Sequence, residues 1–129
     1  MRKGLLYLGS GEEYRKHAIW SAKQSQNFIN YPIALVTDAK PDDTVFDKVI
    51  VDPTLSQSFF DKTTALRQSP FDKTVFLDCD AYVIGDISEL FDLLDSSVVY
   101  PGVFQSLAPR HRILLLDSPH RFLQSLEDF

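Results

Sequence analysis

Two aspartates that follow a short apolar run are the residues of this chain best placed to do chemistry. Asp78 and Asp80 come directly after Val75–Leu77, an unbroken run of Val, Phe and Leu. Such a run fits a strand that is buried on both faces of a parallel sheet. Residues two apart on a strand point to the same side, so we expect both carboxylates to be presented together while Cys79 points away. Two adjacent carboxylates repel each other, and a divalent cation is their natural partner, the alternative being that both are solvated in a turn.

A lysine that precedes this strand is the third candidate. Asp52 followed by Pro53 predicts the start of a helix. The apolar stripe expected on that helix consists of Leu55, Phe59 and Leu66. Lys62 falls in the middle of the stripe, so its ammonium group must either reach past the stripe to solvent or meet an anion near the edge of the sheet.

Alternating strand and helix signals predict a three-layer α/β fold. The expected strands are parallel ones near residues 4–8, 33–37 and 74–78, a weaker one within 45–51, and a strand-like step at 81–84. Right-handed crossovers would join the parallel strands. In open sheets of this kind ligands bind beyond the carboxyl ends of the strands, which is where Asp78 and Asp80 would lie.

Capping signals predict two further helices. Ser10 and Glu13 form a capping box that opens a helix running to Gln26, and Asp86 opens another. The buried stripes expected on these helices are Tyr14, Ala18, Ala22 and Ser25 on the first, and Ile87, Leu90, Phe91 and Leu94 on the second. His17 is expected to face solvent.

Length and composition indicate one globular domain. The chain has 129 residues and a formal net charge of −5, and no basic stripe, so nonspecific binding to nucleic acid or to an anionic membrane is not expected. No apolar stretch reaches the roughly 18 residues of a membrane span. The single cysteine excludes an internal disulfide and fits a reducing compartment, so the expected location is cytoplasmic.

The last part of the chain differs in texture from the rest. Residues 1–95 carry the strand and helix signals, whereas residues 96–129 contain no lysine and are rich in proline. The tail signals are a strand at 98–100, an apolar run at 113–116, and a short helix with Phe122, Leu123 and Leu126. His111 and His120 lie in this tail without the spacing of a metal-binding pair.

The segment Lys62–Phe91 resembles the central part of GT-A glycosyltransferases, above all family 8, the glycogenin and galactosyltransferase-like group. In that family a lysine-bearing helix leads into a strand ending in Asp-x-Asp, and a helix start of the form Gly-Asp-Ile/Leu-x-Glu-Leu follows, as at Gly85–Leu90 here. A looser likeness extends over residues 3–95. The resemblance implies a nucleotide-diphospho-sugar transferase domain, GT-A and Rossmann-like, of which this chain represents the N-terminal half.

The resemblance also implies roles for individual residues. Asp78 and Asp80 would ligate Mn²⁺ or Mg²⁺, which bridges the diphosphate of a nucleotide-sugar donor, a UDP-sugar by likeness. Lys62 would act as the catalytic residue near the phosphates or the sugar of the donor. The turn formed by Leu8, Gly9 and Ser10, together with Asp38, would line the nucleoside pocket. The acceptor is not specified.

The chain departs from the family in its tail. Family members are longer, and a histidine in their later half completes the metal shell, whereas the surroundings of His120 do not match it. We therefore expect a truncated transferase that binds donor nucleotide, transfers sugar poorly, and self-associates through uncovered apolar surface. A non-catalytic nucleotide-binding remnant is the first alternative.

A second alternative is a haloacid dehalogenase-like phosphatase, with Asp78 as nucleophile and Asp80 as general acid. Those enzymes also place two aspartates after a hydrophobic strand. Their motif usually ends the first strand of the core, however, and here it follows apparent βαβ units. They also favour Gly-Thr soon after the motif, where this chain has Ala81 and Tyr82.

Overall fold

The computed structural model describes residues 2–42, 45–57, 60–93, 103–105 and 112–116. Six strands form one sheet in the order β3-β2-β1-β4-β6-β5. Their bounds are β1 (Lys3–Gly9), β2 (Ile33–Thr37), β3 (Lys48–Val51), β4 (Lys73–Leu77), β5 (Val103–Gln105) and β6 (Arg112–Leu116). All neighbouring strands are parallel except β5 and β6, which pair antiparallel.

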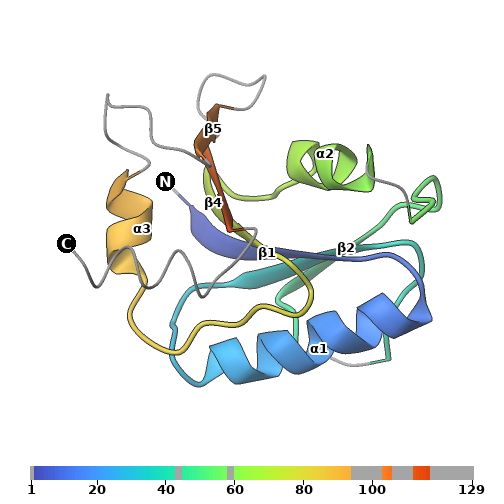
Figure 1. Ribbon diagram of the computed structural model, residues 1–129, viewed down its shortest axis with the longest axis horizontal. Helices are drawn as coiled ribbons and strands as arrows, with labels where there is room; N and C mark the ends of the chain where they lie inside the picture. Colours follow the sequence, from blue (N-terminus) through green and yellow to red (C-terminus); the bar gives the residue numbers. More distant parts are fainter. Residues whose placement is uncertain (1, 43–44, 58–59, 94–102, 106–111, 117–129) are drawn as a thin grey trace.

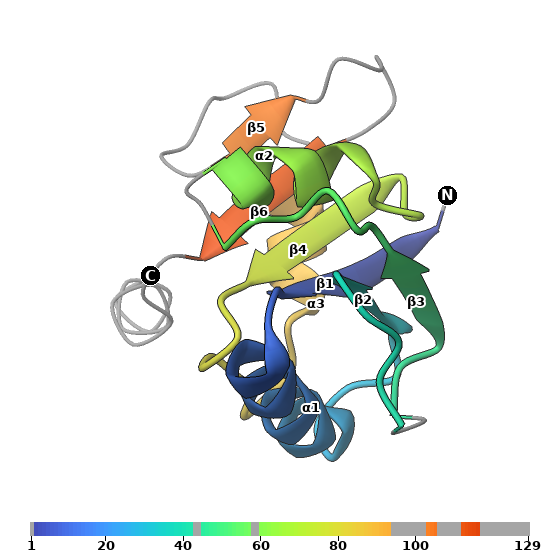
Figure 2. The same cartoon turned by 90° about the vertical axis from the view of Figure 1, so that its right-hand side faces the viewer.

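Helices cover both faces of the sheet, as Figures 1 and 2 show. Helices α1 (Glu12–Gln26) and α3 (Ser88–Leu93) lie on one face, and α2 (Phe60–Arg67) lies on the other. The two faces have separate apolar clusters, one containing Ala18, Ala22 and Phe91, the other Ala65. The predicted three-layer α/β arrangement with parallel strands is confirmed, and it is compatible with a Rossmann-like fold.

Strand β4 lies inside the sheet, between β1 and β6. All five of its residues are buried, and Phe76 is only 1% exposed. Side chains on both faces of β4 meet helices rather than water, which explains why its apolar run does not alternate with polar residues. The expectation of a doubly buried strand before the two aspartates is therefore confirmed.

Helix α1 packs on the sheet through small residues. Its buried residues are Ala18, Ser21, Ala22 and Ser25. The expected place of Tyr14 on this buried stripe is wrong, since its side chain is half-exposed, in the first turn of the helix. The expected capping box is also wrong: Gly11 occupies the N-cap position, and no side chain caps the helix there.

Two serines of α1 hold the chain that follows β4. The Ser21 hydroxyl donates to the carbonyl of Cys79 at 2.6 Å, and the Ser25 hydroxyl accepts the N–H of Val83 at 2.8 Å. The strand-like step expected at 81–84 is wrong, because this segment runs along α1 without joining the sheet. The N–H of Val83 in this segment donates to the side chain of Ser25 instead of to a neighbouring strand.

A buried tyrosine completes this attachment. The Tyr7 hydroxyl donates to the Ala81 carbonyl at 2.8 Å and lies 3.0 Å from the Ser25 hydroxyl. Since the single Tyr7 proton goes to the carbonyl, Ser25 donates to Tyr7. Burial raises the pKa of Tyr7, so the hydroxyl keeps its proton. Strand β1, helix α1 and the segment after β4 thus share one buried hydrogen-bond network.

The helix predicted from Pro53 begins later, at Phe60. Asp52 instead closes a turn, accepting the N–H of Thr54 at 2.9 Å. Leu55 is buried but precedes α2, and Phe59 lies outside the described residues. The weak strand expected within 45–51 is confirmed in its second part only, from Lys48. The later start of the helix arises because Asp52 favours a local turn over a helix cap.

Helix α3 agrees with its predicted pattern. Asp86 accepts the N–H of Ser88 at 2.9 Å, and Ile87, Leu90 and Phe91 are buried. Leu94 lies outside the described residues. No described helix combines the length and apolar character needed to cross a membrane.

Two described segments after residue 95 contribute to the same sheet. The apolar run at 113–116 is part of β6, which pairs parallel with β4. The strand expected at 98–100, the short helix near Phe122, and His111 and His120 lie outside the described residues. Residues 112–116 therefore belong structurally with the residues before 95.

We predict that Tyr7→Phe lowers the free energy of unfolding by about 1–3 kcal/mol, because it leaves the buried Ser25 hydroxyl and Ala81 carbonyl without their partner. Urea unfolding followed by circular dichroism measures this change. Tyr82→Phe is the matched control, since Tyr82 is partly exposed on the same segment, and it should shift stability by less than about 0.5 kcal/mol. Equal stabilities for wild type and Tyr7→Phe would contradict the importance of the network.

Candidate functional site

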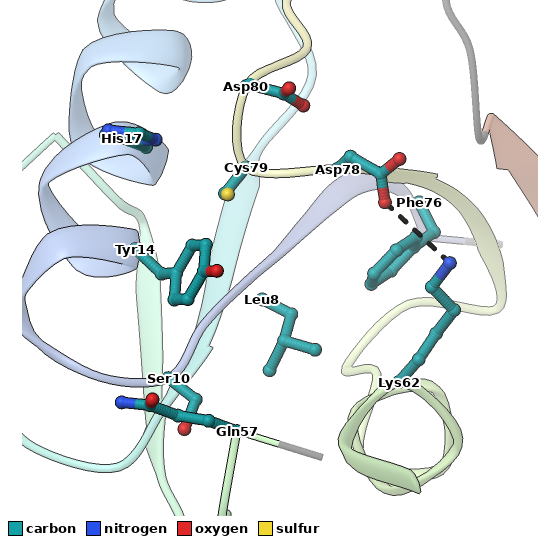
Figure 3. Close-up of a pocket in the computed structure, with 10 residues that line it drawn as sticks. All are labelled: Leu8, Ser10, Tyr14, His17, Gln57, Lys62, Phe76, Asp78, Cys79 and Asp80. Carbon is teal, nitrogen blue, oxygen red and sulfur yellow. Dashed lines mark ion pairs between the residues drawn. The ribbon is translucent and has the colours of Figure 1, made fainter. Parts of the chain in front are cut away.

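A pocket of about 450 Å³ lies at the carboxyl ends of β1 and β4 (Figure 3). The chain runs outward from β1 through β2 to β3, and then returns to the other side of β1 as β4. This reversal is the topological switch point at which open α/β sheets bind ligands. The residues lining the pocket are Leu8, Ser10, Tyr14, His17, Gln57, Lys62, Phe76, Asp78, Cys79 and Asp80.

The two aspartates lie in a tight turn directly after β4. The Ala81 N–H donates to the Asp78 carbonyl at 2.9 Å, which closes the turn. Asp78 is partly buried, Asp80 is exposed, and both line the pocket. In Figure 3 the Cys79 sulfur points away from the two carboxylates. The expectation that Asp78 and Asp80 lie together at the end of this strand is confirmed.

Cys79 is a neutral thiol in this setting. Burial, and then the nearby carboxylates of Asp80 and Asp78, raise its pKa to about 11. A thiol with so high a pKa carries almost no thiolate near neutral pH, and the thiolate is the nucleophilic form. Cys79 therefore serves as a wall of the pocket.

Lys62 reaches the aspartates from the opposite helix layer. Its Nζ lies 3.8 Å from Oδ1 of Asp78, and 5.8 Å from the centre of the Phe76 ring. The lysine stem thus passes along an apolar side chain while the ammonium group meets an anion. The prediction that Lys62 points toward this end of the sheet is confirmed. Lys62 therefore gives Asp78 a nearby cation that is remote from it in sequence.

Leu8 lines the pocket, whereas Gly9 and Asp38 are not among its described lining residues. A Cβ at Gly9 would lie 3.0–3.2 Å from backbone atoms of Tyr14 and Arg15. Glycine at this position is therefore explained by the close approach of α1 to β1. The structure brings together Leu8 and the three charged candidates, whereas Gly9 and Asp38 stay outside the described pocket lining.

Asp38 holds the N-terminus of α1. Its carboxylate accepts the Gly11 N–H at 3.0 Å and pairs with the guanidinium of Arg15. The hydrogen bond from Gly11 lowers the pKa of Asp38, and the backbone N–H of Asp38 and then the Arg15 charge lower it further, against the opposing effect of burial. The positive end of the helix is thus already matched by a carboxylate, which disfavours an additional anion at this helix end.

No protein-family model and no curated protein matches this sequence. The geometry of the pocket therefore carries the functional argument. Within the part of the chain that the structure describes, no group of three or more His, Cys, Asp or Glu side chains is arranged to hold a metal ion. A cation at Asp78 and Asp80 would need further ligands from a bound molecule or from water.

The lining residues that were not expected at the site from the sequence include Tyr14, His17 and Gln57. Tyr14 and His17 lie one turn apart on α1, and their rings meet edge to face, with centroids 6.3 Å apart. The exposure expected for His17 is confirmed, but that expectation did not show that it faces a pocket. Gln57 carries no recognisable sequence signal, because its position depends on a loop.

We predict that Asp38→Asn destabilises the fold by about 0.5–1 kcal/mol near neutral pH, because the N-terminus of α1 loses a charged partner. The folded-state pKa of Asp38 lies below its ordinary value of 3.8. The wild-type advantage should therefore be complete above about pH 5 and disappear as the pH falls through the folded-state pKa. Denaturant unfolding of both proteins between pH 2 and 7 measures this difference.

Asp42→Asn is the control for this measurement, because Asp42 is exposed on the same side of the molecule. Its stability should follow the wild-type curve at every pH. An advantage of wild type over Asp38→Asn that grew on acidification would contradict the assigned role of the carboxylate.

Proposed function

We propose that the pocket binds the nucleoside diphosphate of a sugar nucleotide together with Mn²⁺ or Mg²⁺, and that the chain is the donor-binding part of a GT-A-type glycosyltransferase. The observation that carries this proposal is the meeting of Lys62, Asp78 and Asp80 at one pocket. The pocket lies at the switch point of the sheet, where α/β proteins of this kind bind ligands. Its volume of about 450 Å³ is in the range of small-molecule sites.

The charges that line the pocket favour a metal-bound diphosphate over a free one. Two carboxylates and one ammonium group leave the wall with an excess negative charge, which repels a bare diphosphate. A divalent cation at Asp78 and Asp80 would reverse the sign of that charge. Magnesium is commonly held by one or two carboxylates together with substrate phosphates, so the pair of aspartates fits such an ion.

Each of these residues has a distinct task in the proposed site. Asp78 and Asp80 hold the cation, and the hydrogen bond from Ser21 to Cys79 fixes the turn that carries them. The flexible side chain of Lys62 lets its ammonium group leave Asp78 and form an ion pair with a phosphate oxygen. Leu8 gives the pocket an apolar wall. When bound, the cation would stabilise negative charge on the departing nucleoside diphosphate.

The two alternatives predict different outcomes of simple assays. A nucleotide-binding unit without transfer would be stabilised against heat by UDP with Mn²⁺, but would not turn over a UDP-sugar. A phosphatase would release phosphate from a generic phosphoester, and Asp78→Ala would abolish that release. Transfer or hydrolysis of a UDP-sugar that is lost in Asp78→Ala would support the transferase.

We predict that Asp80→Asn weakens the binding of UDP in the presence of Mn²⁺ by about tenfold or more, because a charged ligand of the cation is lost. Without metal the same change should leave UDP affinity equal or higher, because a repelling charge has been removed. Isothermal titration under both conditions measures the two affinities.

Asp92→Asn is the matched control, since Asp92 is exposed on α3 and does not line the pocket. It should bind UDP as wild type does under both conditions. Superimposable Mn²⁺–UDP titrations for wild type and Asp80→Asn would refute the metal assignment.

We predict that Lys62→Ala weakens the binding of Mn²⁺–UDP by about 3- to 30-fold, with a change in unfolding free energy below about 1 kcal/mol. The ammonium group is partly exposed beside Asp78, so its loss harms the fold little. Arg67→Ala, a change on the same helix outside the pocket, should alter neither quantity. Lost stability with unchanged UDP affinity would instead make Lys62 a packing residue above Phe76.

A further inference from the structure

Gln57 stands at one end of the pocket, near Ser10, while Asp80 lies at the other end (Figure 3). A Cβ on Gly11 would lie only 2.0 Å from the amide nitrogen of Gln57. The absence of a side chain at Gly11 therefore leaves the space that the amide occupies. This contact places the Gln57 amide against the start of α1, where the pocket begins.

The backbone of Gln57 is held in an unfavourable conformation. Its φ angle is 59°, and no other non-glycine residue in the described part of the chain has a positive φ. The carboxylate of Asp61, only 5% exposed, accepts the N–H groups of Ser56 at 3.1 Å and Gln57 at 2.7 Å. A strained residue that is fixed by a buried carboxylate is typical of a position kept for function rather than for stability.

The polar groups at this end of the pocket are neutral. The Gln57 amide offers a donor and an acceptor side by side in one plane. The Ser10 hydroxyl is buried and has no hydrogen-bond partner within the described residues. The other end carries Lys62, Asp78 and Asp80. The pocket is therefore suited to a ligand with a charged end and an uncharged end that forms hydrogen bonds.

We propose that the Gln57 amide recognises the base of the bound nucleotide, by pairing with the adjacent carbonyl and N–H groups on the edge of uracil. This inference rests on the proposed function and adds a specificity-determining residue to it. The turn held by Asp61 brings the Gln57 side chain to the end of the pocket that Ser10 also lines. The same backbone with a glycine at position 57 would be more stable but would not contact the base.

The test compares UDP with N3-methyl-UDP, which lacks the N–H group of the base, by titration in the presence of Mn²⁺. Gln57→Ala should weaken UDP binding by about 3- to 10-fold and leave N3-methyl-UDP affinity nearly unchanged, because only UDP loses a pairing. Gln57→Gly should show the same loss for UDP together with a higher Tm, because the strain is relieved. Gln26→Ala, at the far end of α1, is the control and should change neither affinity.

Equal weakening of both ligands by Gln57→Ala would overturn the contact with the base, and so would an unchanged UDP affinity. A lower Tm for Gln57→Gly would overturn the argument from strain. Failure of the wild-type protein to bind UDP with Mn²⁺ would refute the proposed function itself. That result would be reached before any Gln57 variant is compared, so the two failures are distinguishable.

Discussion

The packing of α1 on the sheet through Ala18, Ser21, Ala22 and Ser25 is the constraint on which the rest of the structure depends. Small side chains let the helix lie close enough for two hydroxyls to reach the segment after β4. Larger apolar residues would have kept that segment at a distance and left its backbone groups without partners. The aspartate turn is thus positioned by the helix, and not by the strand alone.

The pocket joins contributions from elements that are far apart in the chain. Helix α2 brings Lys62 from one layer, and α1 brings Tyr14 and His17 from the other. Strand β4 ends between them, directly before Asp78. Each group is placed by burial of the element that carries it, while its polar end stays at the sheet edge. This division lets a packed core and a charged wall lie within a few ångströms of each other.

The parts of this arrangement that sequence predicts are those set by local pattern. The buried strand before Asp78 and the stripe of Ile87, Leu90 and Phe91 follow from periodicity, and the structure agrees with both. The position of Lys62 near Asp78 could also be predicted from the sequence, because a lysine within an apolar stripe must either reach solvent or meet an anion. These predictions need only one element at a time.

The parts that sequence misses depend on contacts between distant segments. Ser10 looks like a helix cap, but Asp38, which directly follows β2, accepts the N–H of Gly11 instead. The position of Gln57 depends on the bonds that Asp61 makes with a loop, which no periodic pattern encodes. Tyr14 satisfies the helical stripe, yet the sheet ends beneath it, so it is half-exposed at the pocket. Tertiary context overrides local preference at each of these positions.

The pairing of β1 with β4 has a consequence for the order of folding. Their register matches Lys3 with Lys73 and Tyr7 with Leu77, so two segments separated by most of the described chain must meet before the pocket exists. Contacts of such long sequence separation form slowly, because closing a long loop reduces chain entropy before the contact stabilises it. The pocket therefore forms only after β1 and β4 have paired. A ligand that fits the pocket would bind only chains in which these two strands are already joined.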